Sequence, residues 1–486
     1  MQYQSTRDSG NAVSSSEAIL RGISPDGGLF VPQSFPAADL AGWKKLSYPA
    51  LAERVLAGFL TDYAPDFLRD AAVKTYGDAF GGKAGQTARV RDGLYTLELW
   101  HGPTCAFKDY ALQLMPRLLV QAKKNLQRTE TTRILVATSG DTGKAALAGY
   151  AGLEGIEIAV FYPNAGTSEI QRLQMATQQG KNVAVYAVNG NFDDAQTGVK
   201  RAFGDAAVAA ELEKQDIRLS SANSINWGRL APQIVYYFYA YFRLCETGAA
   251  TMGEPVDFCV PTGNFGDILA GYYAKRMGLP VGRLVCASNR NKVLTDFIRT
   301  GTYDARRAFY KTESPSMDIL ISSNLERLLY HVSGSTEKVA GWMRELAATG
   351  SYTVDADTLA KIREDFDCGY ADDTAAAGEL RARFEQDRYL CDTHTAVAFR
   401  VAACARSDAR PMVVLSTASP FKFPRAVLAA LGQPVPESDF AAMAALGAHT
   451  GETAPAALRV LDTLPVRFTK VIDPADIRGV ALQKTL

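Results

Sequence analysis

The chain has 486 residues, and its 52 basic and 52 acidic residues balance to a formal net charge of zero. Such a chain lacks the basic excess that nucleic-acid binding requires, so we expect no nucleic-acid partner. Hydrophobic residues make up 47% and charged residues 21%, which is typical of a globular protein with a large core. The length corresponds to roughly two to four domains.

Nothing in the sequence indicates a membrane segment or an oxidising compartment. The first ten residues, MQYQSTRDSG, lack the apolar stretch of a signal peptide. The longest apolar run, residues 234–242, is too short to span a bilayer and predicts a buried core helix. Seven cysteines without a Cys-x-x-Cys pair argue against a disulfide framework, and four scattered histidines argue against a metal site. We therefore expect a cytoplasmic protein with no membrane partner and no metal.

The elements expected in the first part of the chain lead up to a single lysine. Residues 1–95 are predicted to form a mainly helical N-terminal domain, and residues 94–100 alternate like a β-strand. A Gly-Pro turn follows, and Lys108 then begins a segment whose apolar residues recur on one face of a helix. Pro116 lies inside this segment and predicts a bend in the helix.

Strands and helices alternate over residues 96–430, which predicts an α/β domain with mostly parallel sheets. Strands are expected at residues 134–137, 256–260, 284–288 and within 411–423. The domain is expected to contain a small subdomain at about residues 130–225 and a largely helical insertion at about residues 300–400. A C-terminal extension over residues 431–486 follows. Ligands bind at the carboxyl ends of parallel strands, and Lys108 and three turns rich in glycine or hydroxyl groups follow such ends.

Lys108 stands directly behind the apolar pair Ala106-Phe107 in the stretch HGPTCAFKD. Lysine is seldom fully buried without a reason. Either Lys108 is a surface residue at the start of a helix, or its amine lies in a partly apolar pocket. In such a pocket desolvation lowers the pKa of the amine and makes it a nucleophile. This stretch by itself leaves both interpretations open.

The turn PTGNFGD is a candidate anion site. Its glycines allow a close approach of the backbone, and the helix after it presents unpaired N–H groups. We expect Gly263, Asn264, Phe265 and Gly266 to hold a phosphate and Asp267 to cap the helix. A plain connection between a strand and a helix would use the glycines in the same way.

Two other turns carry hydroxyl groups. The turn SGDTG, residues 139–143, suits a carboxylate or a phosphate, and STASP places Thr417 where a neutral hydroxyl could reach a ring nitrogen. In both turns the hydroxyl groups could instead close their own turns.

In this order, HGPTCAFKD, SGDTG, PTGNFGD and STASPFKF resemble the motifs of threonine synthases of the long bacterial and fungal type. That family consists of pyridoxal-phosphate enzymes of fold type II. The segments at residues 16–32, 223–238, 322–329 and 392–399 are similar to other motifs of the family, and the resemblance extends from about residue 3 to residue 425. It implies an α/β fold like that of the tryptophan synthase β subunit and the cofactor pyridoxal 5'-phosphate.

The resemblance also implies roles for single residues. Lys108 matches the lysine that forms the Schiff base, and Thr417 matches the hydroxyl residue at the pyridine nitrogen. The positions that match the surroundings of the cofactor phosphate are Gly263, Asn264, Phe265, Gly266 and Asp267. The positions implied to contact the substrate are Ser139 and Thr142 at its carboxylate, and Asn223, Ser224 and Arg229 at its phosphate. Arginine suits a phosphate because its planar fork binds two oxygens.

Asp141 is implied to face the phenolic oxygen of the cofactor. An ionised carboxylate would repel a phenolate there, so we expect a shared proton or an altered geometry. The chain also departs from the more usual family sequence, because Lys144 and Ser419 replace a serine and a histidine and Cys105 replaces an aliphatic residue. These departures bear on the identity of the substrate.

The implied reaction converts O-phospho-L-homoserine and water to L-threonine and phosphate by γ-elimination and β-addition. One alternative is a related phospholyase that yields a 2-oxo acid, ammonia and phosphate, and another is a fold type II dehydratase that needs no second phosphate site. An alternative of a different class is a catalytically inactive binding module with the same fold. The resemblance favours a monomer over a homodimer.

Overall fold

The structure is a computed structural model that describes residues 1–10, 12–164, 167–406 and 410–485. Its larger sheet has six strands in the order β13-β10-β9-β14-β4-β3, and these neighbours are all parallel except β3 and β4. Its strands are β3 (Gln86–Arg91), β4 (Leu94–Glu98), β9 (Val256–Pro261), β10 (Val281–Ser288), β13 (Phe366–Tyr370) and β14 (Met412–Ser416). The predicted α/β class with mostly parallel sheets is confirmed.

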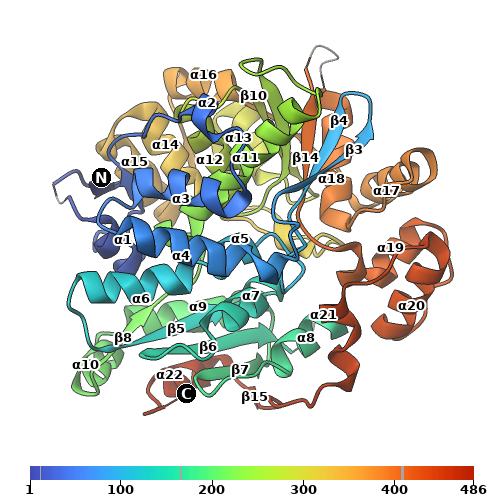
Figure 1. Ribbon diagram of the computed structural model, residues 1–486. Helices are drawn as coiled ribbons and strands as arrows, with labels where there is room; N and C mark the ends of the chain where they lie inside the picture. Colours follow the sequence, from blue (N-terminus) through green and yellow to red (C-terminus); the bar gives the residue numbers. More distant parts are fainter. Residues whose placement is uncertain (11, 165–166, 407–409, 486) are drawn as a thin grey trace.

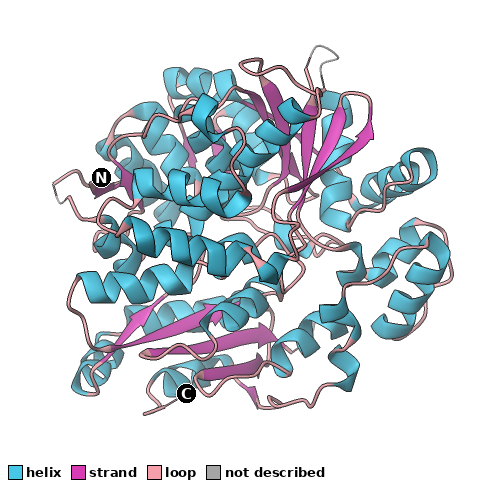
Figure 2. Cartoon of the chain, viewed as in Figure 1, coloured by secondary structure: helices cyan, strands magenta, loops and turns pink. Residues whose placement is uncertain are grey.

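A second sheet lies below the first in Figures 1 and 2, and its five strands run in the order β15-β7-β6-β5-β8. All four of its pairings are parallel. Its strands are β5 (Thr131–Ala137), β6 (Ile156–Pro163), β7 (Val183–Val188), β8 (Ile217–Ser220) and β15 (Val471–Ile472). Helices α7 (Asp141–Tyr150), α8 (Glu169–Ala176), α9 (Phe192–Gly204) and α10 (Ala206–Lys214) connect its strands.

The N-terminal part is mainly helical and packs on one long central helix. Strands β1 (Tyr3–Ser5) and β2 (Phe30–Pro32) form an antiparallel pair. The helices of this part are α1 (Ser15–Arg21), α2 (Leu40–Trp43), α3 (Tyr48–Phe59) and α4 (Pro65–Tyr76). The central helix, α11 (Trp227–Glu246), begins where Asn226 caps the N–H of Gly228 and is buried over most of its length. The core helix predicted at residues 234–242 is thus confirmed as part of α11.

Pro116 separates two helices instead of bending one. Helix α5 (Asp109–Leu112) ends before Leu114, and α6 (Met115–Asn125) begins with Pro116 in its first turn. The first turn is the position where the missing N–H and the restricted φ of proline do no harm. The predicted bend is therefore a complete break, and the short helix that follows Lys108 is set off from α6.

Residues 300–400 are largely helical, but they also complete the larger sheet through β13. Their helices are α14 (Leu325–Ser333), α15 (Thr336–Thr349), α16 (Ala356–Asp365), α17 (Asp373–Asp387) and α18 (Thr393–Ala405). Helices α12 (Gly266–Arg276) and α13 (Val293–Thr300) precede them. Strands β11 (Thr302–Asp304) and β12 (Ser351–Thr353) form a separate antiparallel pair.

The C-terminal segment runs from the larger sheet down to the smaller one along one side of the molecule (Figure 1). Its helices are α19 (Pro424–Ala430), α20 (Asp439–Thr450), α21 (Ala456–Arg459) and α22 (Ile477–Ala481). Strand β15 pairs Val471 with Ala187 and Ile472 with Val188 of β7, so the end of the chain extends the smaller sheet. No helix within the described ranges is both long and apolar enough to cross a bilayer.

Candidate active site

Lys108 lies in a turn that is hydrogen-bonded to the turn after β14. The N–H of Phe107 donates to the carbonyl of Thr417 at 2.8 Å, and the N–H of Ser419 donates to the carbonyl of Cys105 at 3.1 Å. Cys105 has a φ of 59°, a left-handed conformation that non-glycine residues seldom adopt. The two segments meet because β4 and β14 are parallel neighbours whose carboxyl ends lie side by side.

The amine of Lys108 is held in a mostly buried position. Lys108 is 9% exposed, and its Nζ lies 3.4 Å from Oγ of Ser316 and 3.8 Å from Oδ2 of Asp141. Burial lowers the pKa of Lys108 to about 8, although Asp141 acts in the opposite direction. The geometry therefore favours the buried amine over the surface lysine.

Asp141 has a strong partner that the sequence did not indicate. Nζ of Lys422 lies 2.6 Å from Oδ1 of Asp141, and Nε2 of Gln171 donates to the same oxygen at 2.9 Å. Burial alone would raise the pKa of Asp141, but Lys422 and Lys108 outweigh it and hold this pKa well below its usual range. The low pKa indicates that Asp141 is ionised, and Lys422 supplies the opposite charge.

The turn between β9 and α12 has the conformation of an anion cradle. Phe265 has a φ of 62° and directly precedes the right-handed turn of α12, and a left-handed residue followed by right-handed ones makes successive N–H groups converge. A Cβ at Gly263 would lie 2.6 Å from the carbonyl oxygen of Ser316, so only glycine fits there. Asn264 is exposed, but its carbonyl accepts from the N–H of Asn324 at 3.1 Å.

Asp267 does not cap α12, and that expectation is wrong. Phe265 occupies the cap position without a side-chain hydrogen bond, and the carboxylate of Asp267 turns inward to α11. The hydroxyls of Tyr236 and Tyr237 donate to its Oδ1 at 2.5 and 3.1 Å, while its Oδ2 is buried without a partner among the described residues. Burial raises the pKa of Asp267 to about 6.

The residues expected at the substrate phosphate lie at the start of α11 and just before it. Oγ of Ser224 accepts from Nδ2 of Asn324 at 3.2 Å, and Asn223 is half-buried in the same turn. Arg229 is 3% exposed, and its Nη1 donates to the carbonyl of Ala222 at 2.5 Å. Nε of Arg229 is buried without a partner among the described residues. Arg229 also contributes to the lowered pKa of Lys108, which places both in one electrostatic environment.

The turn between β5 and α7 carries the two residues expected at the substrate carboxylate. Ser139 and Thr142 are half-buried on either side of Gly140 and Asp141. Gly140 has a φ of 148°, which favours glycine at this position. Both hydroxyl residues thus lie in the same turn as Asp141, whose Oδ2 lies 3.8 Å from Nζ of Lys108.

Two of the three departures from the usual family sequence, Lys144 and Ser419, have hydrogen-bond partners. Nζ of Lys144 donates to Oε1 of Gln178 at 2.7 Å, which ties α7 to the segment after α8. Ser419 is fully buried, and its Oγ accepts from the N–H of Phe421 at 3.3 Å at the start of the 3-10 helix Pro420–Lys422. Ser419 therefore helps to place Lys422.

Several residues of the site were missed by reasoning from the sequence. Lys422, Asn324 and His394 lie within the segments STASPFKF, SSNLERLL and DTHTAVAF, so their place in family motifs was the available signal. Nε2 of His394 accepts from the N–H of Ser316 at 3.1 Å, and Nδ1 pairs with Asp392 at 2.6 Å. No local pattern marks Ser316, which reaches Lys108 only through the fold.

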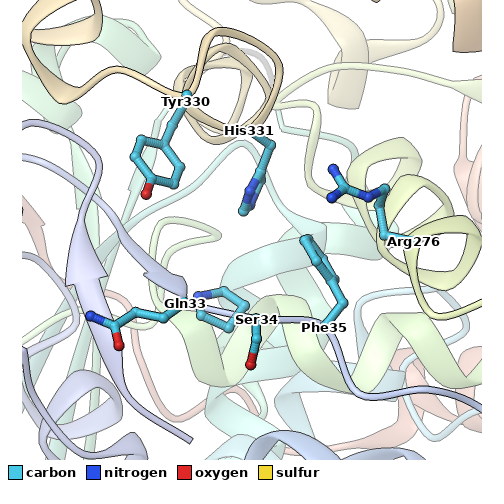
Figure 3. A pocket seen from close by; sticks show the side chains of 8 residues that line it. Gln33, Ser34, Phe35, Arg276, Tyr330 and His331 are labelled. Carbon is cyan, nitrogen blue, oxygen red and sulfur yellow. The ribbon is translucent and has the colours of Figure 1, made fainter.

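A pocket of about 430 Å³ lies elsewhere, beside the C-terminal end of α12 (Figure 3). Its lining comes from the segment after β2, from Arg276 and from Tyr330 and His331 of α14. None of the residues expected at the site lines this pocket. Within the described ranges no three His, Cys, Asp or Glu side chains gather as metal ligands would.

Comparison with known families accounts for nearly the whole chain. Residues 2–76 match the family model "Threonine synthase N terminus", residues 85–418 match "Pyridoxal-phosphate dependent enzyme", and residues 395–481 match "Threonine synthase, C-terminal". The threonine synthase of Pseudomonas aeruginosa is 40% identical over 445 residues, which cover 89% of this chain and 91% of that relative. The threonine synthase of Schizosaccharomyces pombe is 37% identical, with 89% of each chain covered.

A solved structure agrees with these matches. The PLP-bound threonine synthase of Brucella melitensis has a TM-score of 0.89 and 36% sequence identity to this chain, and the similarity covers 100% of this chain and 99% of that one. Because the matches include all of the segments that surround the buried Lys108, the chain belongs to the threonine synthase family of pyridoxal-phosphate-dependent enzymes.

Proposed function

We propose that this protein is a threonine synthase that converts O-phospho-L-homoserine and water to L-threonine and phosphate. The observation that carries the proposal is the buried amine of Lys108, which lies beside Asp141 and has a pKa lowered to about 8. A lowered pKa increases the share of the neutral, nucleophilic amine that a Schiff-base lysine needs. The family matches over the whole chain support the same reaction over the alternatives.

The described residues fit pyridoxal phosphate. The left-handed Phe265 and the first turn of α12 offer converging N–H groups for the cofactor phosphate, with Gly263, Asn264 and Gly266 in the same turn. Thr417, a buried neutral residue at the end of β14, is assigned to the pyridine nitrogen. Asp141 is assigned to the phenolic oxygen, and its pairing with Lys422 offsets the charge that would repel a phenolate. Asp267 supports the phosphate turn from beneath through its two tyrosine partners.

The substrate is held at its two anionic ends. Ser139 and Thr142 present hydroxyl and N–H groups at the start of α7 for the carboxylate. Asn223, Ser224 and Arg229 are assigned to the substrate phosphate, and the unpartnered Nε of buried Arg229 supports this role. A buried donor without a partner has a free-energy cost that a phosphate oxygen would remove.

The protein's side chains move the protons of the proposed reaction. When bound, the cofactor serves as an electron sink for carbanions of the substrate. Lys108 would hold the cofactor before the substrate binds, and its freed amine would then remove and return protons at successive substrate carbons. Arg229 holds the phosphate that leaves from Cγ, and water adds at Cβ. The surroundings exclude other water, because Lys108 and Arg229 are both nearly buried.

Product analysis tests the proposal directly. Purified protein loaded with pyridoxal phosphate is incubated with O-phospho-L-homoserine, and amino acids, phosphate and 2-oxobutyrate are measured. Equal amounts of threonine and phosphate support the synthase. Phosphate with 2-oxobutyrate and no threonine would replace the synthase with a phospholyase, and a colourless protein that takes up no cofactor would indicate an inactive binding module.

We further propose that the protein works as a cytoplasmic monomer with three parts. These are an N-terminal domain over residues 1–95, a cofactor-binding domain over residues 96–430 and a C-terminal extension over residues 431–486. The resemblance of the motifs from HGPTCAFKD to STASPFKF to those of the family supports the monomer. Sedimentation equilibrium of the loaded protein tests the monomer.

A further inference from the structure

Lys422 is a fully buried cation at the centre of the candidate site. It lies at the end of the 3-10 helix Pro420–Lys422 and is 0% exposed. Its Nζ lies 2.6 Å from Oδ1 of Asp141 and donates to the carbonyl of Thr104 at 3.0 Å. A buried ammonium carries a large desolvation penalty unless a counter-ion and hydrogen bonds compensate it. Lys422 has both.

Asp141 stands between two lysines and presents a different oxygen to each. Lys422 and Gln171 bind Oδ1, whereas Oδ2 lies 3.8 Å from Nζ of Lys108. A carboxylate with a single cationic neighbour would strongly favour the protonated form of that neighbour. Because Lys422 binds more closely than Lys108, much of the charge of Asp141 is neutralised by Lys422.

The position of Lys422 is coupled to the position of Lys108. The turn that leads to Lys422 is fastened to the turn that leads to Lys108 by the bond from the N–H of Ser419 to the carbonyl of Cys105. The carbonyl of Thr104, in that same turn, accepts from Lys422. These hydrogen bonds fix the position of the Lys422 ammonium relative to the Lys108 amine, with Asp141 between them.

We propose that Lys422 is a positioning residue of the reaction, which pairs with Asp141 so that this carboxylate stays ionised without keeping Lys108 protonated. The inference rests on the proposed role of Lys108 as the amine of the reaction. Lys422 acts through Asp141 and touches no reacting atom in this arrangement. It also lowers the repulsion between Asp141 and a phenolate in front of it.

The balance of charges around Lys108 agrees with this role. Burial lowers its pKa to about 8; Asp141 and Asp267 raise it, while Lys422 and Arg229 lower it. These two carboxylates and two cations belong to α7, α12, the 3-10 helix and α11. Without Lys422, Lys108 would be the only lysine beside Asp141 among the described residues, and the carboxylate would raise the pKa of Lys108 further.

The test measures the protonation of Lys108 in the full-length, cofactor-free protein. Acetic anhydride labels lysines only when they are unprotonated, and peptide mass spectrometry reports the labelling of Lys108 at each pH. Lys422→Met removes the cation but keeps a side chain of similar length, and we expect it to raise the labelling midpoint of Lys108 by about one pH unit or more. Asp141→Asn should lower the midpoint, and the double variant should bring it back toward that of the wild type.

Lys123→Met is the matched control. Lys123 is 8% exposed and donates to two backbone carbonyls, those of Glu130 and Gly155, and it is absent from the groups that act on Lys108. Its replacement should leave the midpoint of Lys108 unchanged. If Lys422→Met fails to fold, the labelling midpoint of Asp141→Asn is compared with that of the double variant. Neither of these proteins contains an Asp141 carboxylate that lacks its counter-ion.

The outcomes separate a positioning role from a purely structural one. A midpoint that rises in Lys422→Met and returns in the double variant supports the proposal. An unchanged midpoint in Lys422→Met, or a double variant that stays as far from the wild type as Lys422→Met, would overturn it. In the loaded protein, the pH titration of the cofactor absorbance should move in the same direction. The wild-type product analysis fails or succeeds independently of these midpoints, so the two proposals can be judged separately.

Discussion

The N–H of Ser316 donates to Nε2 of His394 at 3.1 Å, and this bond fixes the tautomer of the imidazole. Because Nε2 accepts, the ring proton lies on Nδ1, where Asp392 binds it at 2.6 Å. Ser316 in turn places its hydroxyl 3.4 Å from Nζ of Lys108. His394 thereby anchors the segment whose Ser316 hydroxyl lies beside the amine.

His394→Ala should destabilise the protein. The change leaves the part-buried N–H of Ser316 without its acceptor and removes the ring hydrogen bond to Oδ2 of Asp392, which then keeps only the backbone N–H of residue 394. We expect these losses to cost about 1–3 kcal/mol together. Urea unfolding at pH 7 measures the free energy of unfolding. His449→Ala, at an exposed histidine, is the control and should change it little. Equal stability of the two variants would contradict the anchoring role.

The stability of the cofactor-free protein should depend on pH through Lys108. Burial lowers its pKa from 10.5 to about 8, so between these values the unfolded chain binds the proton and the folded protein does not. Stability therefore rises with pH across this window, and below pH 8 the buried amine costs on the order of 3 kcal/mol.

Lys108→Met removes that cost and should be more stable than the wild type below pH 8, with the difference vanishing near pH 10.5. Urea titrations of both proteins from pH 6 to pH 10 measure it. The exposed Lys44→Met serves as the control and should follow the wild type at every pH. A constant difference between Lys108→Met and the wild type would show that Lys108 keeps its proton throughout.

Gly263→Ala should damage the phosphate turn. The new Cβ would lie 2.6 Å from the carbonyl oxygen of Ser316, which is backbone and cannot rotate away. We expect the affinity for pyridoxal phosphate to fall at least tenfold, measured by fluorescence titration of the cofactor-free protein. Gly341→Ala adds the same methyl group in α15 with nothing within 4 Å, and it should leave the affinity unchanged. Normal cofactor binding by Gly263→Ala would place the phosphate elsewhere.

Arg229→Lys should weaken the binding of the phosphorylated substrate. Lysine keeps the charge but lacks the planar fork and the buried Nε, which is free to bind a phosphate oxygen. A charged hydrogen bond contributes about 1.5–3 kcal/mol, so the KM for O-phospho-L-homoserine should rise about tenfold to a hundredfold. Steady-state kinetics measure KM, and the absorbance of the bound cofactor is the control and should stay the same. A loss of cofactor together with substrate binding would mean that Arg229 only supports the fold.

Much of the candidate site could be predicted because its residues lie in short local patterns. The glycines of PTGNFGD, the lysine after an apolar pair and the hydroxyl turn after β14 are each visible within a few residues. The alternation of strands and helices likewise predicted the α/β class. The cap expected from Asp267 failed because two tyrosines of α11, which are distant in sequence, compete for its carboxylate.

The sequence by itself determined where the turns lie, which residues in them carry chemistry, and which family the motifs resemble, because these features depend on neighbours along the chain. Only the tertiary structure decided that Lys422 neutralises Asp141, that Ser316 reaches Lys108, and that the C-terminal strand extends the smaller sheet. The physical reason is that a buried ion pair and a strand pairing depend on distances between segments far apart in sequence. Those distances are set when the parallel strands align and the core packs.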